Sequence, residues 1–170
     1  VNFYGAAPQF ILTTATIGNP QELAETLTES PVKIITEDGS ARNEKHFLIY
    51  NPPLTDPKLG LRASTQAEST RIASDLLHYE VQTILFGRSR RSVEWMLQRL
   101  REKSPQHAET IRAYRSGYLP RQRREIEAGL RQGKVRIVAA TTALELGIDI
   151  GGMDAALLAG YPGTIAGTWQ

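Results

Sequence analysis

The stretch that decides the fold is residues 136–164, RIVAATTALELGIDIGGMDAALLAGYPGT. It contains two short apolar runs, Ile137–Ala140 and Ala155–Leu158, which are typical of strands buried on both faces of a parallel sheet. Each run ends in hydroxyl or turn-forming residues: Thr141, Thr142, Gly160, Pro162 and Gly163. Because ligands of parallel sheets bind outside the carboxyl ends of the strands, these residues indicate a phosphate and sugar site.

Upstream of this stretch, strand-like runs alternate with helical patterns. Strands are predicted at residues 10–12, 32–36, 45–50, 83–86 and 111–114. Helices are predicted after Asn19, where Pro20 and Glu22 form a capping signal, at residues 65–78, after Ser89 and from Pro120. Residues 51–63, rich in proline, are predicted to form a loop. The alternation predicts an α/β fold with a mainly parallel sheet of about five to seven strands and helices on both faces.

The composition is that of a globular protein, with 41% hydrophobic and 22% charged residues. No apolar run approaches the roughly 20 residues that a transmembrane helix needs, and no signal peptide pattern is present. A cytoplasmic location and no contact with membrane are therefore expected. The chain has no cysteine and its three histidines are scattered, which excludes disulfides and predicts no metal site.

The net charge of +2 hides an uneven distribution. Residues 88–136 hold 14 of the 20 lysines and arginines but only five of the 18 acids. Such a basic region is typical either of a polyanion-binding surface or of solvated helix faces, and charge alone does not choose between the two. Arg101 is expected to be one of the solvated arginines.

Two further segments carry residues suited to an anion. After the predicted strand at 83–86, Gly87 permits close backbone approach, Ser89 precedes a helix N-terminus, and Arg90 adds charge. In SGYLPRQRREIEAGLRQG, residues 116–133, Gly117 precedes an arginine-rich helix that includes Arg123. GLRQGK, residues 129–134, is not a Walker A loop, because only three residues separate its glycines and valine follows the lysine.

These motifs resemble those of superfamily-two helicases. ATTALELGIDI, residues 140–150, is similar to motif V, which reads ATDxxARGIDI in DEAD-box members, so that Gly147 and Asp149 fall in register. GRSRRS, residues 87–92, resembles motif IV, and residues 116–133 resemble the family segment HGxLxQxxRxxxLxxFxxG, although Tyr114 and Arg115 stand near the family's histidine. Thr14-Ala15-Thr16 resembles the Ser-Ala-Thr motif that closes the first lobe.

The resemblance implies a truncated P-loop NTPase-like, RecA-like helicase C-terminal lobe. Residues 1–20 are then the tail of the first RecA-like lobe, and residues 21–170 are the second lobe, with Gln170 opening motif VI and its arginine finger expected beyond it. By register, the expected nucleic-acid contacts are Gly87, Ser89, Arg90, Gly117, Arg123, Thr141 and Thr142. Gly147 and Asp149 are expected to face ATP, and Thr14 and Thr16 to couple the two ligands. ATP and Mg²⁺ would be bound mainly by the first lobe.

The finer pattern of ATIGNP, FGRSRRSVE and ELGIDIGGMDAALLAGYPGT is most similar to DEXH-type DNA helicases of the mitomycin-repair branch. This resemblance implies a fragment of an ATP-dependent helicase or translocase, whose partners are single-stranded DNA and the first lobe of the same parent chain. Two alternatives remain open: an RNA helicase lobe, and a non-catalytic α/β module that binds nucleic acid or protein.

Overall fold

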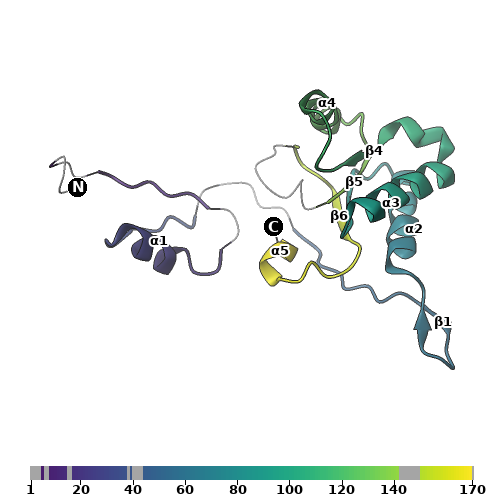
Figure 1. Cartoon of the computed structure of the whole chain (residues 1–170), viewed down its shortest axis with the longest axis horizontal. Coiled ribbons are helices and arrows are strands. Elements are labelled where there is room, and N and C mark those ends of the chain that lie inside the picture. The colour runs from purple at the N-terminus through teal and green to yellow at the C-terminus, as the bar shows by residue number, and fades with distance from the viewer. Residues whose placement is uncertain are drawn as a thin grey trace. The chain divides into compact units, whose positions relative to one another are not determined.

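The computed structural model describes residues 5, 8–14, 17–37, 39, 44–141 and 150–169. The chain divides into two compact units, Val1–Ile49 with Thr164–Gln170, and Tyr50–Gly163 (Figure 1). Four of the predicted site residues, Thr16, Thr142, Gly147 and Asp149, lie outside the described residues. The predicted lobe boundary at residue 20 stays a prediction.

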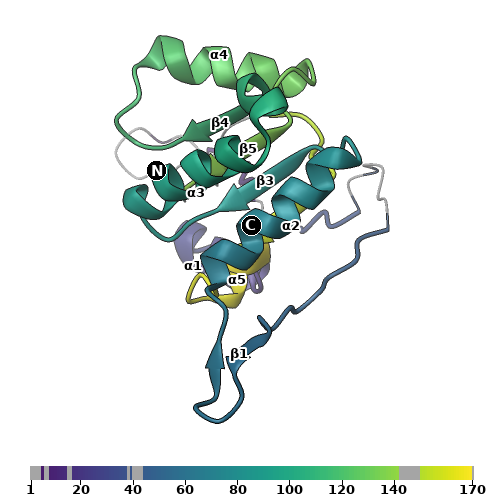
Figure 2. The same ribbon diagram turned by 90° about the vertical axis from the view of Figure 1, so that its right-hand side faces the viewer.

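The unit Tyr50–Gly163 is built on a four-stranded parallel sheet with the strand order β4-β5-β3-β6, of which Figure 2 labels β4, β5 and β3. The strands are β3 (Thr83–Phe86), β4 (Ile111–Tyr114), β5 (Ile137–Ala140) and β6 (Ala155–Leu158). All four lie where the sequence predicts them. In the register, Phe86 pairs with Ala140 and Leu158, and Ala140 pairs with Tyr114. The four carboxyl ends therefore meet at one edge of the sheet.

Helices cover both faces of this sheet, as predicted. On one face, α2 (Thr65–His78) and α3 (Arg90–Lys103) pack on a core that contains Leu85, Ile111, Ala113, Ile137 and Ala139. On the other face, α4 (Pro120–Arg131) packs on Ile84, Tyr114, Val138 and Ala140. The two sets alternate along each strand because successive side chains of a strand point to opposite faces. A short 3-10 helix, η1 (Pro105–Thr110), connects α3 to β4.

The prediction of five to seven strands is wrong for the described part of the chain. Residues 10–12, 32–36 and 45–50 have no assigned secondary structure. The side chains of Ile35, Leu48 and Ile49 are largely exposed. An apolar β-type pattern predicts a strand only where a partner strand supplies hydrogen bonds, and no described strand pairs with these segments.

The predicted loop at 51–63 contains a small hairpin instead, in which β1 (Leu54–Asp56) pairs antiparallel with β2 (Leu61–Arg62). The prolines lie outside the strands, so they remove no ladder hydrogen bond. The Asp56 carboxylate accepts hydrogen bonds from the backbone N–H groups of Lys58 and Leu59, at 2.9 and 3.1 Å, and Gly60 has a φ of 66°. Turn-forming residues thus marked the bend between two short strands.

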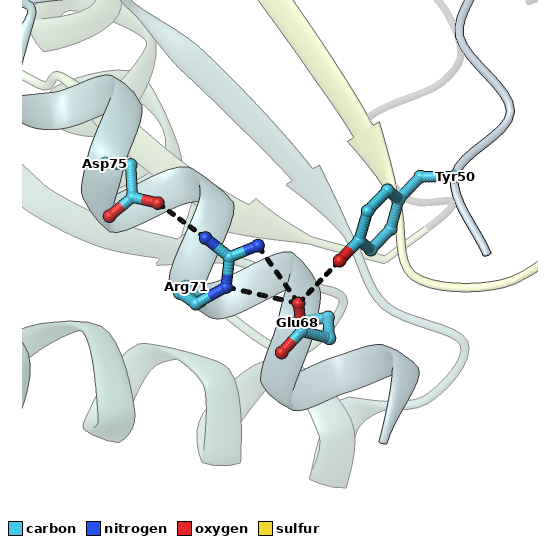
Figure 3. A network of polar contacts seen from close by, with 4 residues as sticks. All are labelled: Tyr50, Glu68, Arg71 and Asp75. Carbon is cyan, nitrogen blue, oxygen red and sulfur yellow. Dashed lines mark hydrogen bonds and ion pairs between the residues drawn. The ribbon is translucent and has the colours of Figure 1, made fainter. Parts of the chain in front are cut away.

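Helix α2 begins after Ser64, whose hydroxyl oxygen accepts a hydrogen bond from the N–H of Ala67. One Glu68 carboxylate oxygen accepts from the Tyr50 hydroxyl at 2.9 Å and from Arg71 Nε and Nη2 at 3.1 and 3.0 Å (Figure 3). Arg71 also pairs with Asp75 at 2.8 Å. The hydrogen bonds from Arg71 and then Tyr50 lower the pKa of Glu68. This network fastens residue 50, where the unit begins, to α2.

In the other unit, α1 (Pro20–Thr28) begins after Asn19 as predicted. The predicted capping box does not form, because the Asn19 amide donates to the Glu22 carboxylate at 2.9 Å and makes no side-chain cap on the backbone. A second helix of this unit, α5 (Ile165–Trp169), places Trp169 against Phe47, with 5.2 Å between the ring centroids.

Candidate nucleic-acid interface

The carboxyl edge of the sheet gathers the predicted contact residues of three segments. Backbone hydrogen bonds fasten the strand ends to one another: Gly87 N–H donates to Ala140 O at 2.8 Å, and Thr141 N–H donates to Tyr114 O at 3.3 Å. Gly87 and Thr141 therefore follow neighbouring strands at the same level. This is the position at which open parallel sheets bind ligands.

Gly87 is buried, and the structure gives it a packing role that the sequence interpretation missed. An added Cβ would lie 2.6 Å from Met96 Cε and 2.7 Å from Ser92 Oγ. The glycine therefore lets α3 begin close against the end of β3. Its predicted approach to a nucleic-acid backbone stays a prediction.

Ser89 is the N-cap of α3. Its hydroxyl oxygen accepts from Ser92 N–H at 3.1 Å, and Ser89 N–H donates to Ser92 Oγ at 3.0 Å, which completes a capping box. The box fixes the first turn of α3 at the carboxyl edge, where the helix dipole favours an anion. Ser89 is exposed, so a hydroxyl that accepts one hydrogen bond in the cap can still donate one to a phosphate oxygen.

The turn after β4 is held against α3 by two side-chain contacts that the sequence did not predict. Arg90 Nε donates to Ser116 Oγ at 3.0 Å, and Arg115 Nε donates to Glu94 Oε1 at 2.6 Å. The pKa of Arg115 is raised, chiefly by the hydrogen bond to Glu94. Gly117, with a φ of 98°, takes the left-handed conformation that glycine adopts without strain. The four-residue spacing of Arg90 and Glu94 places both on one face of α3, but it does not indicate which segment they contact.

Arg123 lies exposed on α4, close to the buried Tyr114. The Tyr114 hydroxyl donates to Glu127 Oε1 at 2.8 Å. Burial, and then this carboxylate, raise the pKa of Tyr114 to about 12, while Arg123 acts in the opposite direction.

Arg101 is not the solvated residue expected from sequence. Its side chain is half-buried and donates from Nη2 to the backbone oxygen of Ile111 at 2.9 Å.

The structure does not place the two predicted coupling residues or the two predicted ATP-facing residues at this edge of the sheet. Thr14 is described and exposed, but it belongs to the other unit, and Thr16, Gly147 and Asp149 lie outside the described residues. Within the described residues, no group of three or more histidine, cysteine, aspartate or glutamate side chains could hold a metal ion. Nor does any helix described here have the length and apolar character to cross a membrane.

The chain belongs to the family of the helicase conserved C-terminal domain, whose model matches residues 68–170. It is 47% identical over 170 residues to the uncharacterized ATP-dependent helicase YprA of Bacillus subtilis, covering 99% of this chain and 23% of that protein. It is 36% identical over 168 residues to the ATP-dependent helicase HRQ1 of Saccharomyces cerevisiae, covering 95% of this chain and 16% of that protein.

Among solved structures, the chain is similar to the DUF1998 helicase MrfA. The crystal structure of MrfA bound to DNA matches with a TM-score of 0.92 and 46% identity, covering 99% of this chain and 23% of that one. MrfA bound to DNA and AMPPNP matches with a TM-score of 0.90 and 46% identity, covering 99% and 24%. The predicted superfamily-two helicase lobe is thereby confirmed, together with its RecA-like α/β fold. The chain spans less than a quarter of the length of these relatives.

Proposed function

We propose that this chain is the second RecA-like lobe of a longer ATP-dependent helicase or translocase, and that its carboxyl edge binds the phosphate backbone of single-stranded DNA. The observation that carries the proposal is the common edge at which the α3 N-terminus, the turn at 115–118 and Thr141 follow adjacent strands. Backbone N–H groups, hydroxyls and arginines at such an edge suit phosphate oxygens, and they read no base sequence.

In this proposal, residues 1–20 belong to the first lobe and residues 21–170 to the second. ATP and Mg²⁺ are held mainly by the first lobe, with Gly147 and Asp149 facing the nucleotide, and Thr14 and Thr16 linking the nucleotide state to strand binding. When bound, ATP supplies the free energy of translocation by phosphoryl transfer. The lobe described here contributes backbone contacts, and motif VI contributes the arginine that stabilises the transition state. The cytoplasmic location stays a prediction.

DNA is favoured over RNA because the MrfA crystals contain DNA and share 46% identity with this chain. The test is the ATPase rate of the longer parent protein with single-stranded DNA or with RNA of the same length. We expect DNA to stimulate hydrolysis more strongly. Stimulation by RNA alone would favour an RNA helicase, and stimulation by neither would favour a non-catalytic binding module.

The roles of Thr141 and Asp149 provide a finer test in the parent protein. Asp149→Ala is expected to raise the ATP concentration needed for half-maximal hydrolysis, because a carboxylate that accepts ribose hydroxyl hydrogen bonds contributes roughly 1.5–3 kcal/mol. Thr141→Ala is expected to weaken strand binding and stimulation, with unstimulated nucleotide affinity nearly intact. Nucleotide and strand titrations, beside thermal melting of both variants, separate these effects. Equal loss of both ligands in two destabilised variants would show that the residues only support the fold.

A further inference from the structure

The first two turns of α3 hold the turn after β4 at two consecutive residues. Arg90 and Glu94 are four residues apart, so they lie on the same face of the helix. Arg90 contacts the Ser116 hydroxyl at 3.0 Å, and Glu94 contacts Arg115 Nε at 2.6 Å. Two segments that are separate in sequence, and that both carry predicted strand contacts, are thereby joined by side chains.

Arg115 is engaged on both sides of the turn. Its side chain is 28% exposed and that of Glu94 is 44% exposed, so the ion pair is partly shielded from solvent. Its guanidinium carbon also lies 4.8 Å from the centroid of the Tyr118 ring, and Tyr118 packs against the cores on the two faces of the sheet. The guanidinium therefore spans from α3 to an anchored aromatic ring across Ser116 and Gly117. This geometry orients the Arg115 guanidinium toward Glu94, so Arg115 is suited to supporting the turn at the carboxyl edge of the sheet.

We propose that Glu94 and Arg115 are positioning residues of the nucleic-acid site: they lock residues 115–118 against α3, so that this turn and the α3 N-terminus contact neighbouring phosphates as one rigid surface. The inference rests on the proposed strand-binding function and deepens it. A turn that is ordered before binding spares the complex the entropy cost of ordering it during binding. Loosening the turn should therefore weaken affinity even where no phosphate contact is removed directly.

Because Glu94 is negatively charged, the inference can be tested by whether its substitution weakens or tightens strand binding. A carboxylate near a polyanion opposes binding by simple electrostatics, so Glu94→Gln should tighten binding if charge alone matters. If Glu94 positions the turn, the same substitution should weaken binding, by roughly threefold to tenfold, because a charge-assisted hydrogen bond becomes a neutral one. The two explanations thus predict opposite changes in one titration.

Glu102 provides a matched control on the same helix. Its side chain is 47% exposed and pairs with Arg99 at 3.2 Å, but it lies in the last turn of α3, at the opposite end from the carboxyl edge. Glu102→Gln makes the same change in net charge and also removes one surface ion pair. Its affinity for the strand should be unchanged or slightly tighter. A difference between the two variants therefore reports position and not charge.

Arg115→Lys tests the partner without changing the net charge. Lysine keeps the cation but lacks the planar guanidinium that both donates from Nε and stacks on Tyr118. We expect binding to weaken by a similar factor. The double variant Glu94→Gln with Arg115→Lys should then bind no more weakly than either single variant, because both changes break the same contact.

The experiment measures binding of the whole 170-residue chain to a fluorescein-labelled oligothymidylate by anisotropy, between about 50 and 200 mM salt. Measurements are made well below the melting temperature of every variant. Glu94→Gln should bind more weakly than both wild type and Glu102→Gln, with a salt slope reduced by about 0.7 if one phosphate contact is lost. Equal or tighter binding by Glu94→Gln, or a loss that matches its unfolded fraction, would overturn the positioning role. Salt-independent or absent binding by the wild type would instead overturn the proposed function.

Discussion

Gly87→Ala should destabilise the unit Tyr50–Gly163 through one methyl group. The backbone at Gly87 does not have a positive φ, so alanine adds no backbone strain. The new Cβ would lie 2.6 Å from Met96 Cε, 2.7 Å from Ser92 Oγ and 3.1 Å from Val93 Cγ2. Met96 and Val93 are fully buried in the core, so the Met96 terminal methyl and Val93 must shift within packed surroundings. Overpacking of this kind costs about 1–3 kcal/mol, and displacing Ser92 from the capping box costs about 1 kcal/mol more.

The expected total is a loss of about 2–4 kcal/mol in the free energy of unfolding. Urea unfolding can be followed by the fluorescence of Trp95, which packs against the core of this unit, after Trp169 in the other unit is replaced by phenylalanine. Gly152→Ala is the control, because its Cβ would meet none of the described atoms within 4 Å and its φ is not positive. A loss below about 0.5 kcal/mol for Gly87→Ala would refute the close packing of α3 on β3.

Three further predictions concern catalysis, binding and pH. The 170-residue chain alone should show no nucleic-acid-stimulated ATP hydrolysis in a coupled phosphate-release assay, because it contains no Walker A sequence. Arg123→Ala should lower the logarithmic salt slope of single-strand binding by about 0.7, whereas Arg99→Ala, which removes a cation paired with Glu102, should change it little. The pKa of Tyr114 is raised to about 12 from an ordinary value of 10. The stability that its neutral hydroxyl contributes should thus be present below pH 10 and lost as pH rises through 12, and thermal melts of Tyr114→Phe should lack this alkaline decline.

The parallel sheet could be predicted from sequence because each of its strands has a recognisable local sequence pattern. TILF at 83–86 and IVAA at 137–140 are short and mainly apolar, and glycine or hydroxyl residues follow them, so their length and flanking residues favour buried strands. Residues 45–50 carry a mixed pattern, in which Lys45 and His46 precede four apolar residues, and there the prediction of a strand was wrong. A strand also needs a neighbour, and local sequence does not say whether the chain provides one.

The candidate site divides in the same way. Thr141, Gly87 and Ser89 could be predicted to share an edge, because parallel strands place their carboxyl ends together. The contacts of Glu94 with Arg115 and of Arg90 with Ser116 could not be predicted, because they depend on how α3 is set above the turn after β4. The requirement for glycine at position 87 also comes from packing, since Ser92 and Met96 occupy the space of a side chain. These packing contacts can be identified only from the three-dimensional positions of the neighbouring side chains.

Contacts within the fold also limit what the basic region, residues 88–136, can contribute to nucleic-acid binding. Many of its arginines are already engaged by the fold, in ion pairs with Glu94, Glu102, Glu109 and Glu125 or in hydrogen bonds to Ser116 and the backbone of Ile111. Arg88, Arg91, Arg123 and Arg124 are exposed and form no ion pair within the described residues. With a slope of about 0.7 per phosphate contact, these four arginines would contribute at most about 3 to the salt slope of single-strand binding. A count of charges along the sequence therefore overstates the charge available to bind nucleic acid. An arginine in an ion pair must first break its contact with the carboxylate before it can bind a phosphate.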